Sequence, residues 1–282
     1  MDVRKRAPRE IREFRGVQKT YKLFVNGEFV RSELGRAYRP DGKVNVPRGS
    51  RKDLRDAVRA ARTAFPGWAG RTAMNRGQIL YRAAEMLDGR AAQFAELLGG
   101  GARARRELDL SVETLVWYAG WTDKLSQVTG TVNPVAGPYF NFTIPEPTGV
   151  VAIVAPEEAA LAGLVRRVAP ALCGGNVVVA LAAESQPLAA LTLAEVLATS
   201  DVPAGVVNII SGQRKELVPW LASHMDINAI DTAGCSSDEI KAIEESAASN
   251  VKRVIKVAQN EVSPYLIAAF MEMKTVWHPI GV

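Results

Sequence analysis

The sequence predicts an α/β fold in which a parallel sheet carries helices on both faces. Between residues 149 and 257, short apolar runs alternate with helix-length segments, which is the pattern of repeated βαβ units. The runs are almost continuously apolar, as expected for strands buried on both faces. With 282 residues, 48% of them hydrophobic, the chain has enough apolar material for such a core.

The first elements are a hairpin and a helical layer. In "YKLFVNGEFVRS", apolar and polar residues alternate around Asn26-Gly27, which is a strong signal for a tight hairpin turn. Helical spacing begins after Ser50, a residue suited to a helix cap, and continues to Phe65. Further helices are predicted at 73–98 and 108–125.

The alternating part follows from Gly149. Strands are predicted near Val150–Val154, Val177–Leu181, Val206–Ile210, Ile227–Ile230 and Val254–Val257. Helices are predicted near Ala159–Leu172, Pro187–Ala198, Arg214–Ser223 and Asp238–Ala248.

Three further runs are interpreted as strands. Polar and apolar residues alternate from Tyr139 to Ile144. Near the end of the sequence, the runs Pro264–Phe270 and Lys274–Trp277 follow one another with no turn signal between them. We expect both of them to be strands.

The positive charge is concentrated at the N-terminus. The formal net charge is +5, and residues 1–20 supply seven basic and three acidic side chains, a net +4. We interpret this basic arm as a solvated terminus, with contact to an acidic partner or nucleic acid as the alternative. The remainder is almost neutral, so nucleic acid is not the expected partner.

Composition excludes several classes of protein. No run approaches the length of an apolar membrane span, and the N-terminus has no apolar segment typical of a secretion signal. A cytoplasmic location with no membrane partner is therefore expected. Two cysteines, Cys173 and Cys235, are too few for a disulfide framework or a cysteine-based zinc site, and no metal is expected.

Several long stretches, in order, resemble the aldehyde dehydrogenase superfamily. They are "KLFVNGEFV", "ETLVWYAGWTDKL", "VAPALCGGNVVVALAAESQPLAALTLAEVL", "DVPAGVVNIISG" and "NVKRV". The resemblance implies a Rossmann-like cofactor domain, together with an oligomerisation element built from a β-hairpin and a C-terminal strand. It also implies the family reaction, in which a cysteine thiolate attacks an aldehyde and hydride passes to NAD or NADP.

The same resemblance suggests how the chain is divided. Residues 21–128 and 149–270 correspond to the NAD(P)-binding domain, and 129–148 and 271–282 correspond to the oligomerisation element. The end, "MEMKTVWHPIGV", resembles the extreme C-terminus of family members, where a strand pairs with the oligomerisation hairpin of another subunit. We therefore expect that the catalytic domain is absent, lost from within the chain.

The cofactor residues implied by the family are only partly present. Glu184 matches the glutamate of the ribose clamp, but Leu181 stands where the family has its lysine. Gly212 and Gly234 match family glycines, and Cys235 replaces the serine that contacts the pyrophosphate. Binding of NAD or NADP is thus expected to be possible but weakened.

Acidic residues reinforce this expectation. Glu157 adds negative charge near the expected pyrophosphate. Glu158 stands at the position of the family asparagine that stabilises the oxyanion, and loss of such a donor costs about 100- to 1000-fold in rate. The general-base position falls on Val257 or Ala258, and Glu261 is displaced from the motif. No catalytic residue is expected.

The remaining candidate residues are two cysteines, two histidines and a glycine-rich stretch. Cys173 is interpreted as a buried thiol, and Cys235 is weighed as a reactive one. His224 and His278 lack a nucleophile nearby in sequence. The glycine-rich stretch 98–106 is interpreted as a flexible link, with a phosphate cradle as the alternative.

Three functions are compatible with these observations. The first is a non-catalytic subunit that assembles, through 129–148 and 271–282, with itself or with a full-length aldehyde dehydrogenase. The second is an NAD(P)-dependent oxidoreductase acting on aldehydes. The third is a dinucleotide-binding module without chemistry.

Overall fold

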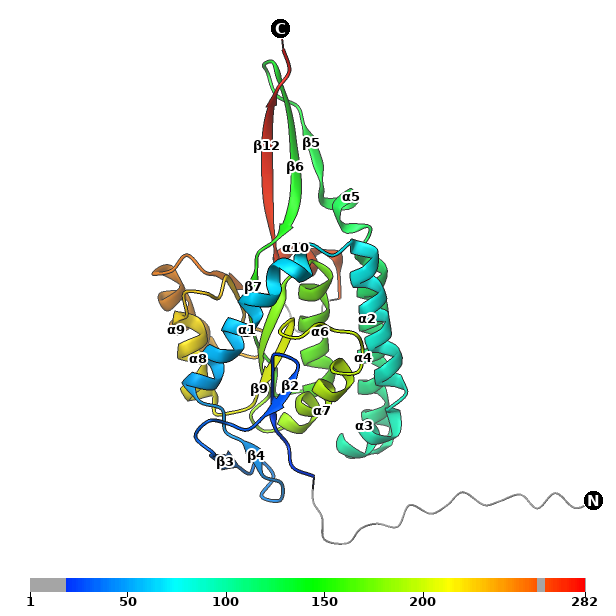
Figure 1. Cartoon of the computed structure of the whole chain (residues 1–282), viewed down its shortest axis with the longest axis vertical. Helices are drawn as coiled ribbons and strands as arrows, with labels where there is room; N and C mark the ends of the chain where they lie inside the picture. The colour runs from blue at the N-terminus through cyan, green and yellow to red at the C-terminus, as the bar shows by residue number, and fades with distance from the viewer. Residues whose placement is uncertain (1–18, 258–261, 282) are drawn as a thin grey trace, which may run out of the picture.

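The structure, a computed structural model, describes residues 19–257 and 262–281. The basic arm therefore lies almost wholly outside the described residues, as do Ala258 and Glu261. The fold is α/β, as the sequence predicts (Figure 1).

A seven-stranded sheet forms the centre of the molecule. Its strand order is β11-β10-β7-β8-β9-β1-β2, with the first five strands parallel and the last two antiparallel. Their bounds are β1 (Leu23–Val25), β2 (Glu28–Val30), β7 (Val150–Val154), β8 (Val177–Leu181), β9 (Val207–Ile210), β10 (Ala229–Asp231) and β11 (Arg253–Ile255). The five predicted strands are confirmed, with ends shifted by up to two residues.

Helices cover both faces of this sheet (Figure 1). On one face lie α2 (Ala73–Asp88), α3 (Ala91–Leu97), α4 (Gly101–Trp121), α6 (Ala160–Cys173) and α7 (Pro187–Leu197). On the other lie α1 (Arg51–Ala69), α8 (Arg214–Ser223) and α9 (Ser237–Ala248). A small ladder of β3 (Ala37–Tyr38) and β4 (Val46–Pro47) precedes α1.

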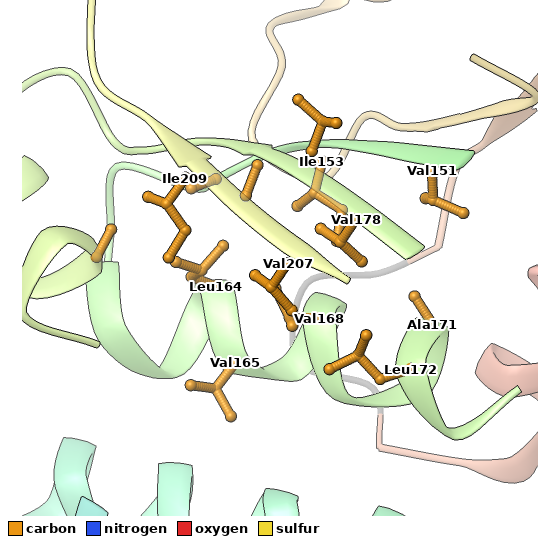
Figure 2. Close-up of a cluster of buried hydrophobic side chains, with 14 of the residues drawn as sticks. Val151, Ile153, Leu164, Val165, Val168, Ala171, Leu172, Val178, Val207 and Ile209 are labelled. Atoms are coloured by element: carbon orange, nitrogen blue, oxygen red, sulfur yellow. The ribbon is translucent and has the colours of Figure 1, made fainter. Parts of the chain in front are cut away.

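Helix α6 supplies much of the apolar contact with the sheet. Figure 2 shows Leu164 and Val168 pointing toward Val178, Val207 and Ile209 of the strands. All five side chains are buried. Every residue of β7 and β8 is buried too, which explains why these strands are apolar without alternation.

Local sequence signals account for the starts of the first elements. The turn residues Asn26 and Gly27 both have positive φ, 55° and 77°, as a two-residue hairpin turn requires. Ser50 caps α1, and its side chain and that of Asp53 each accept a hydrogen bond from the other residue's backbone N–H. Both predictions are confirmed.

The helical layer is divided differently from the prediction. The expected helix 73–98 is two helices, because the chain turns at Gly89 between α2 and α3. The expected link 98–106 is mostly helical, since α4 begins at Gly101. Three successive glycines, 99 to 101, have positive φ and make the turn between α3 and α4.

The prediction of a strand at Pro264–Phe270 is wrong. Pro264–Ala269 forms the helix α10, with proline at its first turn and with Leu266 and Ile267 buried. Periodicity does not distinguish a short buried helix from a buried strand, and the apolar run fits both.

A separate three-stranded sheet projects from one end of the molecule (Figure 1). It has the order β12-β6-β5 and follows the short helix α5 (Leu125–Thr129). Its strands are β5 (Thr131–Asn133), β6 (Tyr139–Pro147) and β12 (Met271–Pro279). All nine residues of β12 pair antiparallel with β6 of the same chain. We call it the projecting sheet.

The base of β12 is fixed to the core at Phe270. This side chain is fully buried, and its carbonyl accepts hydrogen bonds from the Thr148 hydroxyl (2.8 Å) and from Asn176 Nδ2 (3.0 Å). Arg253 of β11 reaches the same base and contacts the carboxylate of Glu272 at 2.8 Å. The start of the projecting sheet is therefore held by side chains of the central fold.

Within the described part of the chain, no helix combines the length and apolar character needed to cross a membrane.

We expect Phe270→Ala to lower the free energy of unfolding by about 3 to 5 kcal/mol, because it leaves a cavity at a fully buried site. Chemical denaturation measures the change. Tyr265→Ala is the control, because this α10 side chain is 80% exposed and should change stability by less than about 0.5 kcal/mol. Equal effects of the two substitutions would contradict the anchoring role of Phe270.

Candidate functional site

The strand order defines where a ligand would bind in a sheet of this kind. From β7 the chain proceeds through β8 and β9 on one side, and it then returns to place β10 and β11 on the other. In open parallel sheets, ligands bind outside the carboxyl ends of the strands at this switch point. The candidate site is therefore the loop region after β7 and β10.

A cavity of about 650 Å³ opens beside this region. It is lined by Tyr38, Arg39, Pro40, Glu157, Glu184, Ser185, Gln213 and Arg214. Glu184 follows β8, and it is one of the four cofactor residues expected from the sequence.

The structure places these four residues differently from one another. Glu184 accepts a hydrogen bond from the backbone N–H of Arg214 at 2.8 Å. Gly234 follows β10 and packs so tightly against the end of β7 that any Cβ there would collide with the carbonyl oxygens of Val154 and Ala155. Gly212 instead packs against Leu217 and Gly49, away from the β7–β10 junction.

Arg214, the first residue of α8, is the central residue of the site. The sequence motifs did not single it out. Its guanidinium contacts the carboxylate of Glu239 through Nη2 at 3.0 Å and through Nε at 3.3 Å. It also lies 3.4 Å from a Glu157 oxygen and donates to the carbonyl oxygens of Ala155 and Gly234. The side chain is only 13% exposed.

Glu157 is fixed by the loop after β8. Its carboxylate accepts the backbone N–H groups of Glu184 (2.8 Å) and Ser185 (3.0 Å) and the hydroxyl of Ser185 (2.5 Å). The negative charge of Glu157, expected from the sequence near a cofactor pyrophosphate, is thus hydrogen-bonded to groups of the chain itself. Glu158, the next residue, is exposed.

The environment of the cluster lowers the pKa of two glutamates and raises the pKa of a tyrosine. Burial alone would raise the pKa of Glu157, but the hydrogen bonds from Ser185 and Glu184, together with Arg214, bring that pKa below its ordinary value. The pKa of Glu239 is likewise lowered, mainly by Arg214 acting against burial. Burial, reinforced by Glu184 and Glu157, raises the pKa of the Tyr38 phenol. Glu157 and Glu239 are therefore ionised at neutral pH, whereas the Tyr38 phenol is protonated.

Neither cysteine has the character of a nucleophile. Burial raises the pKa of Cys235 to about 12, despite the opposing effect of Arg214. Burial also raises the pKa of Cys173 to about 12. Since the thiolate is the reactive form, both side chains are protonated and unreactive at neutral pH.

Leucine and valine stand at the expected lysine and general-base positions, and the two histidines lie outside the lining of the cavity. Leu181 is buried at the end of β8. Val257 offers only its carbonyl oxygen, which accepts a hydrogen bond from Arg167 at 2.7 Å. Burial lowers the pKa of His224, and its Nδ1 accepts the backbone N–H of Asp226. His278 pairs with Phe140 in the projecting sheet.

A dinucleotide does not fit the charges at this site. Its pyrophosphate is an anion, whereas here the carboxylates of Glu157 and Glu239 contact the guanidinium of Arg214, and the carboxylate of Glu184 accepts the backbone N–H of the same residue. That guanidinium is already engaged by two carboxylates and two carbonyl oxygens. In the described residues, no group of three or more His, Cys, Asp and Glu side chains is arranged to hold a metal ion.

The ionised cluster predicts a specific acid sensitivity. Because Glu157 and Glu239 have folded-state pKa values below the ordinary 4.5, their contribution to stability is present above that pH and is lost as the pH falls through the folded values. Urea denaturation at about pH 6 and about pH 3.5 should show a smaller loss of stability for the Glu157→Gln/Glu239→Gln variant than for the wild type. An identical loss in both proteins would contradict the prediction.

Comparison with known proteins agrees with the fold. A model of the aldehyde dehydrogenase family matches residues 39–259. "Aldehyde dehydrogenase, cytosolic 1" of Elephantulus edwardii is 34% identical over 83% of this chain and 49% of its own length. "Retinal dehydrogenase 2" of Homo sapiens is 36% identical over 83% of this chain and 47% of its own.

Solved structures give the same result. A putative aldehyde dehydrogenase from Burkholderia cenocepacia is similar with a TM-score of 0.78 and 30% identity, over 83% of this chain and 50% of that chain. The NAD⁺ complex of an aldehyde dehydrogenase from Bacillus cereus is similar with a TM-score of 0.76 and 30% identity, over 84% of this chain and 50% of that one. The chain spans about half the length of the curated relatives it matches, and it belongs to the aldehyde dehydrogenase family.

Proposed function

We propose that this chain is a non-catalytic member of the aldehyde dehydrogenase family that acts by assembly, through its projecting sheet, with another copy of itself or with a full-length aldehyde dehydrogenase. The observation that carries the proposal is that the projecting sheet exposes large apolar side chains on both faces. The cytoplasm is the proposed location, in keeping with the cytosolic relative.

The exposure of neighbouring residues demonstrates that neither face is covered. Successive residues of a strand point to opposite faces. Tyr139 and Phe140 are 43% and 45% exposed, and Val276 and Trp277 are 37% and 59% exposed. Other exposed apolar side chains of this region are Val132, Ile144, Met273 and Ile280. Several large apolar side chains exposed on one small element support a protein interaction site there.

The outer edge of the sheet supports the same proposal. Strand β12 pairs with β6 on one side, and no other strand of the described residues lies on its other side. A nine-residue edge strand offers unpaired backbone groups to a further strand. The anchoring of Phe270 and Arg253 fixes the base of this strand, which lowers the entropy cost of docking.

Absence of catalysis is supported by the site itself. Both cysteine thiols have pKa values of about 12, so neither supplies a thiolate. Glu158 replaces the oxyanion-stabilising asparagine that the family resemblance implies, and an ionised carboxylate only accepts hydrogen bonds. Weakened cofactor binding is consistent with the carboxylates around Arg214.

Assembly predicts a mass larger than that of the 30.5 kDa chain, either alone or in a mixture with a full-length aldehyde dehydrogenase. Light scattering after size-exclusion chromatography measures it. Replacing Val276 and Trp277 together with glutamate should raise the dissociation constant at least about 100-fold, because it places charges in a desolvated contact.

The matched control is Tyr265→Glu, which alters an exposed aromatic residue outside the projecting sheet. This control should assemble like the wild type, and circular dichroism should show all variants folded. A wild-type protein that remains monomeric alone and in the mixture would refute the proposed assembly.

The purified chain should also produce no NADH or NADPH from an aldehyde, as followed at 340 nm over a range of aldehydes. The alternative, an active oxidoreductase, predicts steady production that is lost on Cys235→Ala. Steady production by the wild type would exclude a non-catalytic role.

A further inference from the structure

We propose that Arg214 acts as an internal ligand in the crevice between the loops after β7 and β10, and that it closes this crevice to dinucleotides in the native chain. This goes beyond weakened cofactor binding and does not depend on assembly. In this chain, the ion cluster of Arg214 with Glu157 and Glu239 occupies the region where the family binds its cofactor.

The position of the guanidinium carries the first step. A ligand at the switch point lies between the loops that follow β7 and β10. Arg214 Nη1 lies 3.4 Å from the carbonyl oxygen of Ala155, after β7, and Nη2 donates to the carbonyl oxygen of Gly234, after β10. One side chain therefore bridges the two loops between which a ligand would enter.

Second, backbone N–H groups around the crevice donate hydrogen bonds to groups of the chain. Anion sites in such folds are made of free backbone N–H groups. Here the N–H of Gly234 donates to the Val154 carbonyl at 3.1 Å, and those of Glu184 and Ser185 donate to Glu157. Three backbone donors beside the crevice, one after β10 and two after β8, are thus occupied by groups of the chain.

The charge at α9 carries the third step. Helix N-termini attract anions, and α9 begins beside Arg214. Its third residue, Glu239, accepts the backbone N–H of the cap residue Ser236 at 2.8 Å and forms a two-point contact with the Arg214 guanidinium. The carboxylate of the chain therefore takes the place that a ligand phosphate would need, and a phosphate there would meet Glu157 and Glu239 as like charges.

Calorimetric titration with NAD⁺ and NADP⁺ tests the proposal on the full chain. The wild type should show no saturable binding up to about 10 mM dinucleotide. Arg214→Ala combined with Glu157→Gln and Glu239→Gln removes the guanidinium and the two carboxylate charges that would repel a phosphate. This triple variant should bind at least tenfold more tightly than the wild type, with a dissociation constant in the low millimolar range or below.

Lys215→Ala is the control, because it removes one positive charge from the same helix at an exposed position. It should bind no better than the wild type. Circular dichroism establishes that each variant is folded, and Arg214→Gln is a milder variant that keeps a polar side chain if the triple variant does not fold.

Two results would overturn the proposal. One is saturable binding by the wild type below about 10 mM dinucleotide, with hydrogen-exchange protection confined to the segments around Ala155 and Gly234. The other is a folded triple variant that gains no affinity, since the crevice would then be closed by something other than Arg214. The first result requires only the wild type, so it can be obtained whatever the stability of the variants.

Discussion

The constraint on which the rest of the structure depends is the burial of β7 and β8 on both faces. Strands without a solvated face need a helical layer on each side, and α1 and α6 supply the contacts on opposite faces. Once both faces are covered, only the two ends of the strands remain for loops. Both surfaces to which we assign a role lie at these ends.

Strand β7 connects the two surfaces. Strand β6 of the projecting sheet ends at Pro147, and only two residues separate it from the start of β7 at Val150. At its other end β7 leads directly into Ala155, whose carbonyl oxygen accepts from Arg214. The surface proposed for assembly and the ion cluster thus lie at opposite ends of one buried strand. Distant sites with no shared partners are expected to act independently.

The family scaffold persists here with different chemistry at its crevice. The glycine at 234 keeps the close approach between the ends of β7 and β10, which only a residue without Cβ allows. Beside it, the guanidinium of Arg214 contacts the carboxylates of Glu157 and Glu239. A fold does not determine a function, and this site shows the distinction residue by residue.

The sequence by itself determined the parallel sheet, its five strands, the Asn26-Gly27 turn and the Ser50 cap, because these follow from local periodicity and turn chemistry. It also predicted Glu184 and Gly234 as cofactor residues; the structure places Glu184 in the cavity lining and Gly234 after β10, and their binding role stays a prediction. Only the tertiary structure decided that Pro264–Ala269 is helical and that Arg214 meets Glu157 and Glu239, which lie 57 and 25 residues from it in the chain. Such contacts depend on which loops the sheet order brings together, and single-sequence patterns carry no record of that.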